Sequence, residues 1–360
     1  MSSRLVCRFF YSRSSSGIRG LTNYCLSCCV NTLLQTLSAT WELVQLLDRW
    51  DTAHLRADDS CNVPLQLKKF LVAMQSEESV SHRNFLHCLD RNGVQLDTQH
   101  DADEVFLFIL NLIQKQMDDT ILAEQIQALY KISMETYVQC VDCDSVQTKE
   151  NYLLSLPLHV KEYHTSLEQC LTSFFEEHKL TGINCCFCVQ CAVKTPTKQV
   201  CLIYNSSISA TANANQYIIF YFQGVRLLSL PPILCIQLKR YRNHGGFTRK
   251  LSYEVTFPEM LDLSRVHQAF SKDFSQPQCQ YTLYAVVVHS GSASCGHYTA
   301  YVRHRDMSWY YADDSHTRQV SWDKVQTSYG GELRHTAYML MYRREESSTT
   351  GIKCHKETTK

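Results

Sequence analysis

Hydrophobic and polar positions divide the chain into a helical first third and a strand-rich second half. In the first third apolar residues recur every three to four positions, which is the spacing of one buried helical face. The spacing predicts helices over residues 28–44, with Ser27 as N-cap, and over residues 60–75, 101–113 and 121–132. We therefore expect an α-helical subdomain in this part of the chain.

Beyond this part the pattern changes to short runs rich in Val, Ile, Leu and Tyr, which is typical of strands. These runs predict strands over residues 152–160, 233–241, 281–289, 297–304 and 337–343. Pro157 lies inside the first of them and indicates an edge strand or an irregularity, because proline has no N–H to donate to a neighbouring strand. The chain is therefore expected to be an α+β protein.

Composition and charge exclude several classes of function. The 35 basic and 35 acidic residues balance, so no broad basic surface argues for nucleic acid as a partner. No apolar run is long enough for a membrane span. Eighteen cysteines without a visible secretory signal predict a reducing compartment, so the chain is expected in the cytoplasm, and also in the nucleus.

Both ends of the chain are expected to lie outside the folded part. The first 19 residues carry four arginines and no acid, a pattern typical either of a disordered or loosely packed terminus or of a mitochondrial transit peptide. Residues 344–360 are polar and are expected to be a disordered tail.

A candidate nucleophile lies where an uncharged segment, residues 20–27, runs into the first helix. Cys28 and Cys29 occupy its first turn. Unpaired N–H groups and the positive end of the helix dipole favour a thiolate there. The alternative is that both cysteines are small buried hydrophobic residues.

A candidate general base follows a loop of small residues. His297 comes directly after Gly296 at the start of a predicted strand. A short aromatic segment downstream ends in Asp313 and Asp314. If the two segments pair, Asp313 can reach the imidazole and orient it. The alternatives are an ordinary strand histidine and a solvated acidic turn.

Two cysteine pairs about 40 residues apart predict a structural Cys₄ zinc site. Cys140 and Cys143 form the first pair. Cys188 belongs to the second, and its partner by spacing is either Cys185 or Cys191. Four thiolates leave no open coordination position, so such a zinc ion would not be catalytic. The alternative is a set of free core cysteines.

Several of these segments together resemble the ubiquitin-specific proteases. Residues 20–35 (GLTNYCLSCCVNTLLQ) resemble the cysteine box of this family, and residues 289–303 (HSGSASCGHYTAYVR) resemble its histidine box. Residues 99–106 (QHDADEVF) are similar to its glutamine–aspartate box, and residues 238–241 (LKRY) to its Leu-Lys-Arg-aromatic strand. The motifs occur in the family's order and cover residues 20–343.

The resemblance implies a papain-like cysteine protease fold over residues 20–343. Its parts would be an α-helical thumb at about 20–133, zinc-bearing β fingers at about 134–230 and a β-sheet palm at about 231–343. No catalytic cofactor is implied. The resemblance assigns roles to Cys28 as nucleophile, His297 as base, Asp313 as third triad member, Asn23 as oxyanion donor and Asp314 as an assisting polar residue.

The resemblance also implies a substrate and a zinc ligand set. The enzyme would be a thiol-dependent isopeptidase that cleaves a ubiquitin-like modifier from target lysines after its C-terminal Gly-Gly. Substrate-binding roles fall on Asp101, which would contact the modifier's tail, and on Tyr298. The implied zinc ligands are Cys140, Cys143, Cys188 and Cys191.

A closer similarity is to one family member, on stretches such as residues 127–130 (QALY) and 140–143 (CVDC). It implies an interferon-induced modifier of two ubiquitin-like folds as the substrate. It also implies a negative role in type I interferon signalling, with the type I interferon receptor complex as a candidate partner. The alternative function is a weakly active or inactive scaffold that regulates signalling by binding.

Two departures from the family pattern stand out. Cys25 replaces the glycine usual three residues before the nucleophile, and a cysteine is strained there if the site needs a positive φ. Residues 201–224 have no counterpart in the family and end in YIIFYFQ. We interpret them either as a retained intron in the gene model or as a long loop at the base of the fingers.

Overall fold

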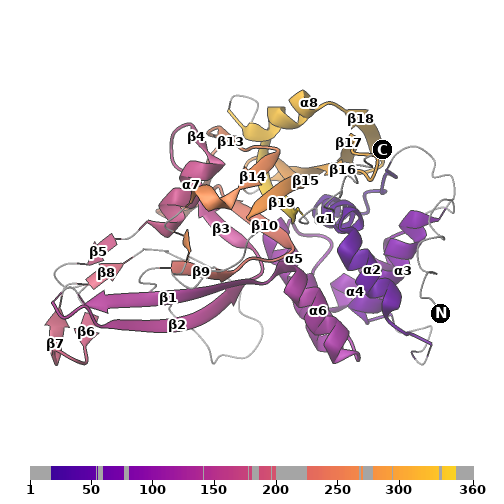
Figure 1. Ribbon diagram of the computed structural model, residues 1–360. Coiled ribbons are helices and arrows are strands. Elements are labelled where there is room, and N and C mark those ends of the chain that lie inside the picture. Colours follow the sequence, from indigo (N-terminus) through magenta and orange to yellow (C-terminus); the bar gives the residue numbers. More distant parts are fainter. Residues whose placement is uncertain are drawn as a thin grey trace, which may run out of the picture.

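The computed structural model describes residues 18–53, 55, 60–76, 81–140, 142–176, 178–180, 186–195, 197–199, 225–266, 269–270, 279–293, 295–331 and 335–345. Most of the two expected disordered ends and the whole 201–224 segment lie outside these residues. The helices of the first part of the chain lie on one side of a mixed sheet, and a long arm of strands extends away from it (Figure 1). The α+β prediction is confirmed.

Six helices form the first part of the chain (Figure 1). They are α1 (Cys28–Ala39), α2 (Trp41–Arg49), α3 (Val63–Gln75), α4 (Arg83–Arg91), α5 (Ala102–Gln116) and α6 (Thr120–Tyr130). Two shorter helices, α7 (Leu167–Phe175) and α8 (Trp322–Gln326), and two 3₁₀ turns, Leu263–Arg265 and Thr327–Tyr329, lie among the strands. The pattern-based prediction did not include α4.

The helix predicted over residues 28–44 is interrupted at Thr40. This residue leaves helical geometry (φ −88°, ψ 79°), and its hydroxyl is 2.8 Å from that of Tyr284 on the sheet. Arg343 donates to the carbonyl of Ala39 at 3.0 Å and pairs with Glu42 at 2.6 Å. Contacts from distant strands therefore break the periodic segment into α1 and α2.

An eight-stranded sheet forms the centre of the molecule. Its strands follow the order β18-β17-β16-β15-β19-β10-β3, and β14 pairs with β15. Their bounds are β3 (Leu156–His159), β10 (Ile233–Lys239), β14 (Met260–Asp262), β15 (Gln280–Gly291), β16 (Gly296–Arg303), β17 (Trp309–Asp313), β18 (His316–Val320) and β19 (His335–Arg344). β3 ends this order, so the prediction that Pro157 lies in an edge strand is confirmed.

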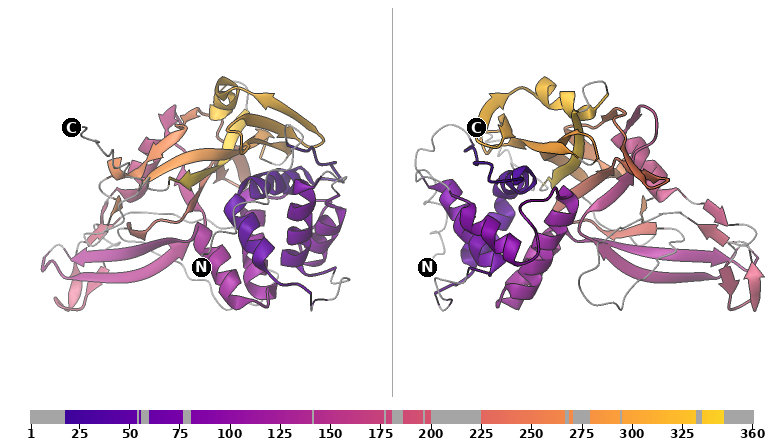
Figure 2. Two further views of the ribbon diagram at one scale, coloured as in Figure 1. Left: turned by 45° about the vertical axis from the view of Figure 1, so that its right-hand side comes forward. Right: turned by 180° about the vertical axis from the view of Figure 1, so that it is seen from behind.

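A second sheet of five strands builds the extended arm, which both views of Figure 2 show reaching away from the helices. Its strands are β1 (Ile132–Cys140), β2 (Val146–Leu153), β5 (His178–Leu180), β8 (Thr197–Gln199) and β9 (Val225–Ser229). The hairpin of β6 (Cys186–Cys188) and β7 (Val193–Thr195) lies at its tip (Figure 1). The remaining two-stranded pairs are β4 (Thr165–Ser166) with β13 (Val255–Thr256), and β11 (Tyr241–His244) with β12 (Phe247–Lys250).

Both faces of the central sheet are buried. Along β15, Ala285 and Val287 join the apolar core shared with the helices, whereas Val286 and Val288 join a second core on the opposite face. This alternation is the period of two expected for a strand covered on both sides. Helix α1 packs on β15 and β16, so the sheet sets the position of the first-turn residues of α1.

The similarity of residues 238–241 to a family motif has a structural explanation in Arg240. Its guanidinium is fully buried and donates to the carbonyls of four residues, Ala337, Leu251, Tyr253 and Tyr329. Burial lowers the pKa of Arg240 to about 10, so the side chain stays charged. It ties β10 to β19 and to the two segments that follow β12 and α8.

Candidate active site

The segment before α1 docks on the turn between β17 and β18. Leu21 donates its backbone N–H to the carbonyl of Asp314 at 2.8 Å. A Cβ atom at Gly20 would lie only 2.1 Å from the carbonyl oxygen of Ser315, so only glycine permits this approach. The docking places Cys28, which is 6% exposed in the first turn of α1, against the ends of β16 and β17.

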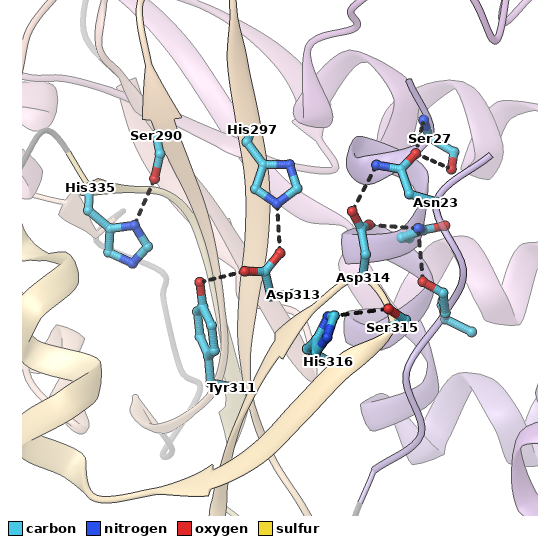
Figure 3. A network of polar contacts seen from close by, with 12 residues as sticks. Asn23, Ser27, Ser290, His297, Tyr311, Asp313, Asp314, Ser315, His316 and His335 are labelled. Carbon is cyan, nitrogen blue, oxygen red and sulfur yellow. Dashed lines mark hydrogen bonds and ion pairs between the residues drawn. The ribbon is translucent and has the colours of Figure 1, made fainter. Parts of the chain in front are cut away.

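His297 lies between Cys28 and Asp313. Its Nε2 is 2.7 Å from Oδ1 of Asp313 (Figure 3), and its ring also interacts with the thiol of Cys28. β16 and β17 pair antiparallel, as the sequence hypothesis required. Cys28 first, and then Asp313, raise the pKa of His297 to about 9 against the opposing effect of burial. The imidazole is therefore protonated at neutral pH, as a thiolate–imidazolium pair requires.

Asp314 holds two asparagines of the nucleophile segment. Its Oδ2 accepts from Nδ2 of Asn23 at 2.8 Å and its Oδ1 from Nδ2 of Asn31 at 2.8 Å (Figure 3). The oxygen of the Asn23 amide accepts from the N–H and hydroxyl of Ser27 at 3.2 and 3.1 Å. Asn23 keeps one N–H without a partner among the described residues, so it can donate to an oxyanion.

Ser27 occupies the N-cap position of α1, but its hydroxyl caps no N–H of the helix. The hydroxyl bonds to Asn23, as above, and accepts from the N–H of Tyr24 at 2.9 Å. The serine therefore organises the segment before the helix instead of the helix end.

Asn31 is a site residue that sequence reasoning missed, and Gln99 was placed in the glutamine–aspartate box without a role of its own. Asn31 is 2% exposed in α1, and the buried residues of this helix also include the polar Thr32, Gln35 and Thr36, so no break in an apolar pattern marks it. Gln99 donates to the carbonyl of Gly296 at 2.9 Å and accepts from its N–H at 3.0 Å. A Cβ atom at Gly296 would lie 2.1 Å from Nε2 of His289, so this strand end admits only glycine.

Asp101 and Tyr298 belong to a largely buried network next to the triad. Asp101 caps α5 by accepting from the N–H groups of Asp103 and Glu104 at 2.8 and 3.2 Å, and it also accepts from the hydroxyl of Tyr338. Tyr298 is 6% exposed, and its ring lies 6.1 Å from that of Tyr338. Burial raises the pKa of Asp101.

Four cysteines gather at the end of the extended arm. The sulfur atoms of Cys140, Cys143, Cys188 and Cys191 all lie within 4.8 Å of one another. The distance from Cys140 to Cys191 is 3.9 Å, and that from Cys143 to Cys188 is 3.6 Å. Tetrahedral Zn–S bonds of about 2.3 Å require about 3.8 Å between sulfurs, so the group fits zinc. Cys185 lies outside the described residues.

The environment of one of these thiols favours its ionised form. The sulfur of Cys188 is 3.3 Å from the hydroxyl of Ser145 and accepts from the N–H of Cys191 at 3.4 Å. These hydrogen bonds lower the pKa of Cys188 to about 6. A thiolate is the form in which cysteine binds a metal.

Cys25 has a φ of +61°, the left-handed conformation that favours glycine. The structure thus bears out the strain expected from the sequence.

We expect Cys25→Gly to raise the free energy of unfolding by about 1 kcal/mol, because the Cβ clash of the left-handed conformation is removed. Urea denaturation measures the change. Cys25→Ala is the control, since it keeps the Cβ; equal stability of the glycine and alanine variants would contradict the prediction.

The pKa of His297 generates a second prediction. In wild type the imidazole should titrate near pH 9, and the midpoint should fall in Cys28→Ala and, by less, in Asp313→Asn. The raised pKa means that the pair stabilises the fold fully below about pH 6.5 and loses this contribution as the pH rises through about 9. NMR of the His297 Cε1–H signal gives the midpoints. Asp306→Asn is the control, and an unchanged midpoint in Asp313→Asn would rule out the proposed coupling.

Comparison with known proteins agrees with this geometry. Residues 19–342 match the family described as "Ubiquitin carboxyl-terminal hydrolase". The chain is 32% identical over 343 residues to Ubl carboxyl-terminal hydrolase 18 from Homo sapiens, covering 92% of this chain and 86% of that protein. It is 33% identical over 342 residues to the protein of the same name from Mus musculus, with coverage of 91% and 86%.

A more distant relative is Ubiquitin carboxyl-terminal hydrolase 47 from Xenopus laevis, which is 25% identical over 405 residues. That alignment covers 92% of this chain but 28% of the relative.

Among the described residues no helix has both the length and the apolar character needed to cross a membrane. From the match over nearly its whole length, we conclude that the chain belongs to the ubiquitin carboxyl-terminal hydrolase family and is a cysteine-type, deubiquitinase-like hydrolase.

Proposed function

We propose that the chain is a thiol isopeptidase that removes a ubiquitin-like modifier from target lysines after its C-terminal Gly-Gly. The observation that carries the proposal is the contact of His297 with both Cys28 and Asp313. The modifier we favour is the interferon-induced one with two ubiquitin-like folds. This choice is supported by the identity to relatives named Ubl carboxyl-terminal hydrolase 18 over nearly the whole chain.

The proposed mechanism assigns each step to a side chain of the site. The thiolate of Cys28 attacks the carbonyl carbon of the modifier's terminal glycine, and the free N–H of Asn23 stabilises the oxyanion. The imidazolium of His297 protonates the leaving lysine amine, which yields a thioester. The neutral imidazole then deprotonates a water molecule that hydrolyses the thioester. Asp313 orients the ring throughout, and Asp314 acts through Asn23.

We assign the modifier's extended tail to the region of Asp101 and Tyr298. Asp101 caps α5, and Tyr298 follows His297 directly on β16. A Gly-Gly terminus suits a narrow passage to a buried thiol, since neither glycine carries a side chain. The buried state of the Cys28 thiol supports this specificity.

A second candidate function is a weakly active or inactive scaffold that regulates signalling by binding the modifier or a receptor complex. The observation in its favour is the left-handed conformation of Cys25 three residues before Cys28, because this strain is a cost to the loop that carries the candidate nucleophile. Under either function we propose a negative role in type I interferon signalling, with the type I interferon receptor complex as a partner and the cytoplasm and nucleus as compartments.

A modifier probe with a C-terminal thiol-reactive group tests the first function. We expect the probe made from the two-fold modifier to label wild type faster than the ubiquitin probe, and Cys28→Ala to remain unlabelled. Cys295→Ala is the matched control, since this exposed cysteine lies two residues before His297 and should not affect labelling. If neither probe labels wild type, the scaffold function replaces the isopeptidase.

We further propose that the four cysteines of the arm hold one structural zinc ion. The sulfur distances support this, and four thiolates would leave the ion no position for catalysis. Metal analysis should find one zinc per chain in wild type and a large loss in Cys188→Ser. Cys185→Ser should keep its zinc; loss of zinc in this variant with retention in Cys188→Ser would reverse the ligand assignment.

A further inference from the structure

A cavity of about 310 Å³ lies beside the catalytic strands, and the proposed mechanism does not use it. Tyr301 of β16 and Tyr311 of β17 line it, together with His335 at the start of β19. Figure 3 shows Tyr311 between His335 and the carboxylate of Asp313. The cavity therefore adjoins the catalytic aspartate through one shared side chain.

The charged groups that line the cavity are all basic. Arg318 of β18 and Lys324 of α8 contribute a guanidinium and an ammonium group, and no lining residue is acidic. Neither cation has a carboxylate partner in the described ranges, and the guanidinium of Arg318 lies 5.3 Å from the ring centre of Tyr311. Two uncompensated positive charges at one cavity favour an anion with two negative charges.

A buried hydroxyl adds a directional donor. Tyr301 is fully buried, and its hydroxyl makes no hydrogen bond to the residues that the structure describes. Thr327 lies near enough to influence the pKa of Tyr301, but its own proton is donated to the carbonyl of Lys324 at 2.7 Å. A buried hydroxyl without a partner costs about 1–3 kcal/mol, which a bound acceptor would recover.

We propose that this cavity binds the phosphate group of a small solute, and that Arg318, Lys324 and the hydroxyl of Tyr301 donate to its oxygens. A phosphate offers more acceptor oxygens than a carboxylate and, as a dianion, matches both cations. The volume is large enough for the phosphate and part of the group that carries it.

An anion bound in this cavity would affect Asp313 and His297 through Tyr311. The hydroxyl of Tyr311 is 3.5 Å from Oδ2 of Asp313, while Oδ1 of the same carboxylate binds His297 at 2.7 Å. An anion that draws Arg318 from the Tyr311 ring, or accepts from its hydroxyl, changes the surroundings of this carboxylate. The site is therefore placed to modulate His297 without contact to the modifier.

Titration with inorganic phosphate, against potassium chloride at equal ionic strength, tests the site. We expect calorimetry to detect binding to wild type, and about tenfold or greater weakening in Arg318→Gln and Tyr301→Phe. Arg305→Gln is the matched control, because Arg305 is also exposed, lies in the turn between β16 and β17 and does not line the cavity. Cys28→Ala should bind as wild type does, so the result does not depend on protease activity.

A separate NMR measurement tests the proposed effect of bound phosphate on His297. Phosphate should shift the His297 Cε1–H signal in wild type, and Tyr311→Phe should abolish this shift while retaining binding. Absence of binding to wild type, or equal binding by wild type and Arg318→Gln, would overturn the site. Loss of binding in Arg318→Gln without loss in Tyr301→Phe would locate the ion on the surface and overturn it as well. An unshifted His297 signal in wild type saturated with phosphate would overturn the coupling.

Discussion

The candidate site depends on the docking of residues 20–27 against the turn that joins β17 to β18. Asp314 accounts for most of it, because its carbonyl accepts from Leu21 and its carboxylate binds Asn23 and Asn31. These contacts join positions almost 300 residues apart in the chain. The candidate nucleophile and oxyanion donor belong to the helical part, and the candidate base and its partner belong to the sheet. These contacts add to the packing of α1 on β15 and β16 and fix the two pairs relative to each other.

The sheet is a rigid support for the docked segment because both of its faces are buried and because Arg240 forms hydrogen bonds inside it. Arg240 forms no ion pair with a carboxylate among the described residues, and it donates to four carbonyls, one in β19 and three in segments outside the regular strands. A lysine has no planar fork and could not reach these carbonyls together. β19 pairs with β15, and β15 pairs with β16, so the position of His297 is set by strand pairing instead of by a flexible loop.

Much of this arrangement could be predicted from the sequence. Alternating and periodic apolar positions identified most helices and most strands of the central sheet, since burial on one or two faces leaves a regular pattern. Helix α4 was missed because polar residues outnumber apolar ones in it, despite a buried side that includes Phe85 and Leu89. The break at Thr40 could not be foreseen, because it depends on Tyr284 and Arg343 from strands near the other end of the chain.

For the candidate site, the sequence predicted Cys28, His297 and Asp313, which the structure brings together, but not all of the residues that position them. Cysteine, histidine and aspartate stand out by type and by their place next to predicted elements. Asn31 and Gln99 act through hydrogen bonds to distant partners, a backbone carbonyl in one case and a carboxylate in the other. No local pattern encodes such partners. The geometry of the chain in space was needed to recognise both.

The strain at Cys25 bears on whether this site is active or relaxed. Three hydrogen bonds hold the surrounding loop: Tyr24 N–H to Ser27, Ser27 N–H to Asn23, and Leu26 N–H to the carbonyl of Leu96 at 3.1 Å. Each bond contributes about 1 kcal/mol, so together they exceed the cost of one residue in the left-handed conformation. The loop can therefore keep its shape with a cysteine in it. The strain then lowers the stability of the whole domain and leaves Asn23 in place, which favours an intact catalytic site over a relaxed one.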